Sequence, residues 1–298
     1  MIDSNAGPLS QPTPGRPAGA GSSRFLDGLG FAEGPRWRDG RLWISDIAAG
    51  EVLCVDGRGT VLRQLEFPGR PSGLGWLPDD RLLVVDMDER RVLRREGDEW
   101  LLHADLSGFT TAPVNDMVVS REGNAYVSGL GYLEGEPHRE TQLLLVREDG
   151  SVQAQPDPLW RPNGMVLTPD GERLIVAETR VHRLTEFNLG PGGGLRSPRT
   201  FAELPKGTWA DGICLDVEGA IWVADPKGRA CRRVDSAGEV VETIDTSPAP
   251  CIACTLGGED GRTLFLLLSG LGDFDELARR RTGRIETVAV AAPGAGSP

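Results

Sequence analysis

The segment ADGICLDVEGAIWVAD (residues 210–225) contains two short apolar strands that are separated by the polar turn VEG. An acidic residue followed by glycine between apolar runs is a strong hairpin signal. The same pattern recurs five more times at intervals of 39 to 48 residues. The other copies begin at EGPRW (33–37), SGLGW (72–76), NDMVV (115–119), NGMVL (163–167) and IACTL (252–256). Six strand-rich repeats of this length, with no helical period, predict an all-β chain that folds as a six-bladed β-propeller.

The repeats define one domain, which we expect to span residues 23–290. Residues 1–22 are rich in Pro, Gly, Ser and Ala and carry almost no large apolar side chain, so they are predicted to form a disordered tail. Residues 291–298 have a similar composition and are predicted to be a flexible C-terminal tail.

Two apolar segments lie outside the six hairpins. One is near residues 25–31, and the other is GRIETVAV (283–290). We expect one of them to complete a blade that both ends of the chain share, because closure removes the exposed edges of a linear array. The only helical candidate is DFDELARRR (273–281).

Composition narrows the possible partners. The net charge of −12 disfavours binding to nucleic acid. No apolar run is long enough to cross a membrane, and the N-terminus lacks the pattern of a secretory signal. Five irregularly spaced cysteines indicate a reducing compartment. We therefore expect a cytoplasmic monomer or small homo-oligomer that acts on a small molecule. The Cys251–Cys254 C-x-x-C lacks a second cysteine pair and is interpreted as packing.

The first residue of each copy carries the functional information, because equivalent positions of a propeller converge on its axis. These residues are Glu33, Ser72, Asn115, Asn163, Asp211 and Ile252. They are expected to precede the inner strands and to meet at one mouth of the central channel. Two carboxylates and two carboxamides offer oxygen ligands only, which suits one divalent cation in the channel, Ca²⁺ first and Mg²⁺ or Mn²⁺ as alternatives. The competing interpretation is that each is an ordinary turn residue before a glycine.

Five segments together resemble the senescence-marker-protein-30/gluconolactonase/regucalcin family of six-bladed propellers, from about residue 25 to residue 290. They are AEGPRW (32–37), VNDMVV (114–119), RPNGMVLTPDGERLIVAET (161–179), ADGICLDVEGAIWVAD (210–225) and CIACTLGGEDGRTLF (251–265). The resemblance implies that Glu33, Asn163 and Asp211 hold the divalent cation. Because oxygen-only ligands tolerate several cations, Zn²⁺ is a further alternative. It also implies that Asn115 contacts the substrate or a water beside the metal. Asp116 follows Asn115 and is expected near the same mouth.

One departure from the family puts a gluconolactone-like substrate in doubt. Sugar-lactone hydrolases of the family tend to carry an arginine two residues before the N-D pair, where this chain has Pro113. The same repeat carries a long insert, GLGYLEGEPHRETQ (129–142), that is either a lid over the channel mouth or an ordinary surface hairpin. If it is a lid, its Tyr132, His138 and Arg139 are candidates for substrate contact.

The predicted chemistry is metal-assisted hydrolysis of a lactone or related ester, because the cation would polarise the carbonyl group. Asp211 is the first candidate for the general base and Asp116 the second, and Asn115 would orient the carbonyl oxygen or the water. None of the three histidines occupies an axial position, and there is no G-x-S-x-G motif. Two alternatives stay open: another reaction in the same metal site, such as phosphotriester cleavage or ring formation, and a non-enzymatic calcium-binding propeller.

Overall fold

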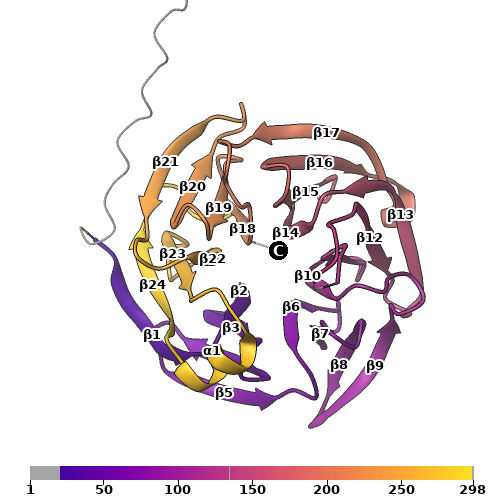
Figure 1. Ribbon diagram of the computed structural model, residues 1–298, viewed down its shortest axis with the longest axis horizontal. Coiled ribbons are helices and arrows are strands. Elements are labelled where there is room, and N and C mark those ends of the chain that lie inside the picture. Colours follow the sequence, from indigo (N-terminus) through magenta and orange to yellow (C-terminus); the bar gives the residue numbers. More distant parts are fainter. Residues whose placement is uncertain (1–20, 134, 297–298) are drawn as a thin grey trace, which may run out of the picture.

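Each repeat folds into an antiparallel sheet of four strands, and the six sheets are arranged as blades around a common axis (Figure 1). The computed structural model describes residues 21–133 and 135–296. From the axis outward, the first three blades are β2 (Ala32–Arg38), β3 (Arg41–Asp46), β4 (Glu51–Asp56) and β5 (Val61–Glu66); β6 (Pro71–Trp76), β7 (Leu82–Asp86), β8 (Arg91–Glu96) and β9 (Glu99–Asp105); and β10 (Val114–Val119), β11 (Ala125–Gly129), β12 (Thr141–Val146) and β13 (Val152–Leu159).

The remaining blades follow the same order around the ring. They are β14 (Pro162–Leu167), β15 (Arg173–Glu178), β16 (Arg183–Leu189) and β17 (Leu195–Glu203); β18 (Ile213–Leu215), β19 (Ile221–Asp225), β20 (Ala230–Val234) and β21 (Val240–Asp245); and β22 (Cys251–Gly257), β23 (Thr263–Leu268), β24 (Gly283–Ala289) and β1 (Ser23–Leu29). Each inner strand contacts the inner strands of both neighbouring blades, so the ring is closed. The predicted six-bladed propeller is confirmed.

The sixth blade joins the two ends of the ordered chain. β1 pairs with β24 as the outermost strand of the sheet, so both of the apolar segments outside the hairpins contribute to it. Aromatic side chains stabilise this closure: the ring centroids of Phe25 and Phe265 are 5.0 Å apart, and those of Trp37 and Phe265 are 5.3 Å apart. Trp37 belongs to β2 of the first blade, so the same cluster also connects the sixth blade to the first.

Local sequence accounts for the turns and for the single α-helix among the described residues. Asp39 and Gly40, between β2 and β3, both have positive φ (+51° and +71°), as expected of a two-residue hairpin turn. The predicted helix forms as α1 (Phe274–Arg280), and the Asp273 side chain caps it by accepting a hydrogen bond from the Glu276 amide at 3.0 Å. A 3₁₀ turn spans Pro191–Gly193. No helix in the described ranges is both long and apolar enough for a membrane span.

The core lies mainly between adjacent blades. One cluster, for example, unites Leu83 and Val85 of β7 with Val127 and Leu144 of the next blade. The five cysteines are all buried, and Cys251 and Cys254 belong to such a cluster between blades five and six.

The C-terminal segment differs from the prediction of a flexible tail over 291–298. Through residue 296 it lies against blade five, where the Val217 amide donates to the Pro293 carbonyl and the Ala295 amide donates to the Leu215 carbonyl, both at 3.0 Å. The buried side chain of Ala292 adds an apolar contact. Small residues signal flexibility in the sequence, but here they allow the backbone to lie close to the sheet. The predicted N-terminal tail lies outside the described residues as far as residue 20, as do residues 297–298.

Candidate metal centre

The first residues of the repeats lie near the starts of the inner strands, but only Asp211 precedes its strand as expected. Glu33, Ser72, Asn115, Asn163 and Ile252 are each the second residue of an inner strand rather than a residue that precedes it, whereas Asp211 lies two residues before β18. In these five blades the pairing of the inner strand with the next strand shifts register at or just after this residue. Irregularities of this kind redirect side chains at the start of a strand.

The glycine that follows several of these residues permits close contact between blades. A Cβ atom on Gly164 would lie 2.6 Å from the Asp211 carbonyl oxygen, and one on Gly212 would lie 2.6 Å from the Cβ of Ala253. The Gly164 amide donates to the Asp211 carbonyl at 3.3 Å. The N-G and D-G pairs therefore bring Asn163 and Asp211 together across two blades. Both glycines therefore have a packing role between blades, whatever part they also play in a turn.

Buried acids hold the segments that lead into the inner strands. Asp225, the last residue of β19, accepts a hydrogen bond from the Trp209 amide at 3.0 Å, two residues before Asp211. Glu178, the last residue of β15, accepts one from the Trp160 amide at 2.8 Å, three residues before Asn163. This role was not predicted from the sequence, although an acid recurs at the end of the second strand in LWISD, LLVVD, LIVAE and IWVAD.

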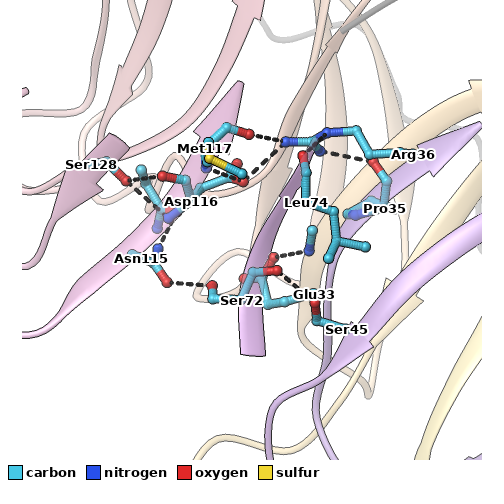
Figure 2. Close-up of polar contacts among 12 residues, drawn as sticks. Glu33, Pro35, Arg36, Ser45, Ser72, Leu74, Asn115, Asp116, Met117 and Ser128 are labelled. Atoms are coloured by element: carbon cyan, nitrogen blue, oxygen red, sulfur yellow. Dashed lines mark hydrogen bonds and ion pairs between the residues drawn. The ribbon is translucent and has the colours of Figure 1, made fainter. Parts of the chain in front are cut away.

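Side-chain hydrogen bonds connect three of the blades at the channel mouth. The Ser72 hydroxyl donates to Asn115 Oδ1 at 3.1 Å, and Asn115 Nδ2 donates to Asn163 Oδ1 at 2.9 Å. Figure 2 shows Asn115, Ser72 and Glu33 in a row across neighbouring strands. Glu33 Oε2 accepts from the Gly34 amide at 3.0 Å. Asp211 Oδ1 is buried and has no hydrogen-bond partner among the described residues.

Two carboxyl groups at this mouth have raised pKa values. Burial, followed by the negative charges of Asp211 and Asp116, raises the pKa of Glu33 well above its ordinary value. Burial raises the pKa of Asp211 to about 7, although the positive charge of Arg161 and a hydrogen bond from Asn163 oppose the shift. Desolvated carboxylates that repel one another in this way are stabilised by a nearby cation.

Asp116 has a different environment from the other acids. Its Oδ1 is 3.1 Å from Arg36 Nη2 and also accepts a hydrogen bond from the Met117 amide at 2.7 Å. Arg36 comes from β2 and is held by the carbonyls of Leu74, Pro35 and Met117 (Figure 2). This buried ion pair and the Met117 amide both engage Oδ1 of Asp116.

The 129–142 insert lies at the same end of the propeller, between β11 and β12. Its Tyr132 and His138 pack edge to face, with ring centroids 3.9 Å apart, whereas Arg139 is exposed. The structure adds two residues that the sequence analysis did not select, Arg161 and Arg180. The Arg161 guanidinium lies 5.6 Å from the centre of the Tyr132 ring, and Arg180 Nη2 contacts His138 Nε2.

The donor set fits a hard divalent cation. Over residues 21–133 and 135–296, no three His, Cys, Asp or Glu side chains come together as metal ligands. A cation here would therefore need the Asn163 carboxamide in addition to Glu33 and Asp211, with Asn115 beside it. This all-oxygen set, with the unpartnered Asp211 oxygen among its members, is of the kind that Ca²⁺ accepts.

Comparison with known proteins places this arrangement in a family. Residues 31–269 match the model of the SMP-30/gluconolactonase/LRE-like region. The chain belongs to this family. Among its relatives, a pentonolactonase from Haloferax volcanii is 27% identical over 282 residues, which cover 89% of this chain and 92% of the relative. A 6-deoxy-6-sulfogluconolactonase from Pseudomonas putida is 24% identical over 244 residues, covering 80% and 83%.

The fold of a solved member agrees with that of this chain. The crystal structure of regucalcin from Agrobacterium tumefaciens, described as a calcium-binding protein, superposes with a TM-score of 0.79 at 22% identity, over 95% of this chain and 97% of that one. At 22% identity this likeness establishes the shared propeller fold only. The chemistry of the site has to be inferred from its residues.

Proposed function

We propose that the chain is a divalent-metal-dependent hydrolase of a lactone or related carboxylic ester. The observation that carries the proposal is the convergence of Glu33, Asn163 and Asp211 at one mouth of the channel, where Asp211 Oδ1 is buried without a partner and both carboxyls have raised pKa values. The names of the two lactonase relatives support the substrate class. The calcium-binding description of the regucalcin neighbour supports Ca²⁺ as the cation.

Each side chain at the channel mouth has a separate role in this proposal. Glu33, Asn163 and Asp211 would hold the cation, which when bound supplies a Lewis acid for the lactone carbonyl. Asp211 would accept the proton of the attacking water, because its buried Oδ1 has no other partner among the described residues. Asn115, fixed by its hydrogen bonds to Ser72 and Asn163, orients the carbonyl oxygen or the water. Asp116 and Arg36 hold the backbone of β10 in place.

The decisive experiment combines chelation with one substitution. We expect Asp211→Ala to abolish Ca²⁺ binding, measured by calorimetry, together with hydrolysis of D-glucono-1,5-lactone, measured with a pH indicator. Glu239→Gln, which changes an exposed acid of the same blade, should alter neither. Full activity of the unsubstituted protein in EDTA would overturn the metal dependence.

A second candidate function is calcium binding without turnover, which the description of the regucalcin neighbour favours. It predicts Ca²⁺ binding that depends on Asp211 but no hydrolysis across a panel of neutral and acidic lactones. A panel that also contains phosphotriesters separates lactone hydrolysis from another reaction in the same site.

A further inference from the structure

Blade four presents two arginines side by side at the channel mouth. Arg161 immediately precedes β14, and Arg180 lies two residues after the end of β15. The backbone holds the two segments together, since the Thr179 amide donates to the Arg161 carbonyl at 3.2 Å and the Arg180 amide donates to the Trp160 carbonyl at 3.5 Å. Both side chains are half-buried. Arg161 adopts a φ of +52°, an unusual backbone conformation for a residue with a side chain.

His138 joins these arginines from the 129–142 insert. Its Nε2 contacts Arg180 Nη2, and its ring packs against Tyr132, over which the Arg161 guanidinium also lies. Burial, and then the positive charges of Arg180 and Arg161, lower the pKa of His138 below its ordinary value. Three nitrogen-rich side chains from two blades therefore lie close together beside Tyr132.

Several nitrogen atoms of this cluster have no hydrogen-bond partner among the described residues. Arg161 Nε, Arg180 Nε and His138 Nδ1 are buried without a hydrogen-bond partner, and no described acid forms an ion pair with either arginine. Glu178, the acid at the end of β15, already accepts hydrogen bonds from Arg183, Thr185 and the Trp160 amide. Leaving buried donors unmatched is costly, and an anion is the partner that would satisfy them.

The cluster also lies next to the proposed metal centre. Arg161 is two residues from Asn163, and it is close enough to Asp211 for its charge to oppose the rise in the pKa of that carboxyl. A ligand whose carbonyl is held at Asp211 could therefore place another part of its structure against Arg161 and Arg180. This position is on a different blade from Pro113, where lactonases of the family tend to carry their arginine.

We propose that Arg161, Arg180 and His138 bind a negatively charged group of the substrate, so that the preferred lactone or ester is an acidic one that carries a carboxylate, sulfonate or phosphate. Guanidinium groups suit this role because they stay charged and donate two parallel hydrogen bonds to such groups. The assignment of the bound molecule as substrate rests on the proposed function, whereas binding of the anion does not.

Binding to the metal-free protein tests the site without turnover. In EDTA, we expect sodium D-glucarate to bind in a calorimetric titration, whereas the neutral polyol D-glucitol should not. Arg161→Gln and Arg180→Gln should each weaken glucarate binding about tenfold or more, the usual scale for one charge-assisted hydrogen-bond pair. Arg180→Lys should retain part of the affinity. Arg121→Gln, an exposed arginine at the opposite end of the channel, is the matched control and should change nothing.

A kinetic comparison separates this proposal from the proposed function. With Ca²⁺ present, both Gln variants should lower kcat/KM for D-glucaro-1,4-lactone about tenfold or more relative to any change in kcat/KM for neutral D-glucono-1,5-lactone, so the ratio of the two values is the readout. If neutral lactone is hydrolysed but glucarate binding is insensitive to both substitutions, the acidic-substrate proposal is wrong and the hydrolase stands. Equal binding of glucarate and glucitol would also overturn it. Arginine-dependent glucarate binding with no hydrolysis of any lactone would instead refute the hydrolase and retain the anion site.

Discussion

At the scale of single residues, the acids at the channel mouth differ in what neutralises them. Asp116 has the Arg36 guanidinium, and Glu178 and Asp225 have Arg183 and Arg232. Glu33 and Asp211 have no ion-pair partner within the described part of the chain, and their pKa values rise accordingly. The acids with partners hold the structure in place, and the two without partners are the candidates for cation binding.

The raised pKa of Asp211 predicts how stability depends on pH. The folded, metal-free protein holds this proton more tightly than the unfolded chain, so the stabilisation is complete below the ordinary aspartate value of 3.8 and is lost as pH rises through about 7. We expect the Tm in EDTA to fall between about pH 5 and pH 8, and saturating Ca²⁺ to raise the Tm most at the upper end. Scanning fluorimetry measures both effects.

Substitutions at two acids provide the control for this pH dependence. Asp211→Asn should flatten part of the decline in Tm that is seen in EDTA, and Glu239→Gln should leave the decline intact. A Tm in EDTA that is level across this pH range would contradict the assignment of a raised pKa to Asp211.

At the scale of the element, the sequence predicted the hairpins well and the starts of the inner strands less well. Apolar strands with an Asp-Gly turn locate β2 and β3, and apolar strands with a Glu-Gly turn locate β18 and β19, because those signals are local. The register shifts at Glu33 and Asn163 arise from pairing between strands, which leaves no local signal. Arg161 and Arg180 escaped selection for a similar reason: they come together only when β14 and β15 pair and the insert folds over them.

The contact between inner strands makes a prediction about Gly164. A methyl group there would lie 2.6 Å from the Asp211 carbonyl oxygen and 2.7 Å from the Ile213 amide nitrogen, and neither backbone atom can move without shifting β18. We expect Gly164→Ala to cost about 1–3 kcal/mol of stability, as overpacking does, and to weaken Ca²⁺ binding by separating Asn163 from Asp211. Urea unfolding and calorimetry measure the two effects. Gly108→Ala, where a Cβ atom meets nothing within 4 Å, is the control, and equal behaviour of the two variants would refute the close-contact argument.

At the scale of the whole molecule, a repeated scaffold supports an asymmetric site. The six blades share strands and turns, but only four of the six equivalent first positions carry an acid or a carboxamide; Ser72 and Ile252 are the exceptions. The insert and the two arginines add a second asymmetry on blades three and four. Repetition in the sequence was therefore sufficient to predict the fold, whereas the differences between repeats predicted the candidate ligands. Among the described residues, the strand pairing that joins the two ends of this ring is that between β1 and β24.

This pairing predicts the effect of removing β1. A chain that begins at Ala32 lacks Phe25, leaves the edge of β24 unpaired, and uncovers Phe265, which is 2% exposed in the closed ring. Compared with a chain that begins at Gly21, we expect its Tm to fall by roughly 10 °C, since several kcal/mol of strand pairing and apolar burial are lost. Its Ca²⁺ affinity should fall as well, because Glu33 lies on the neighbouring β2. A synthetic peptide of residues 21–30 should restore part of the Tm by pairing with β24, and a peptide of the same composition in scrambled order should not. Identical melting of the two chains would show that closure by β1 contributes little to the ring.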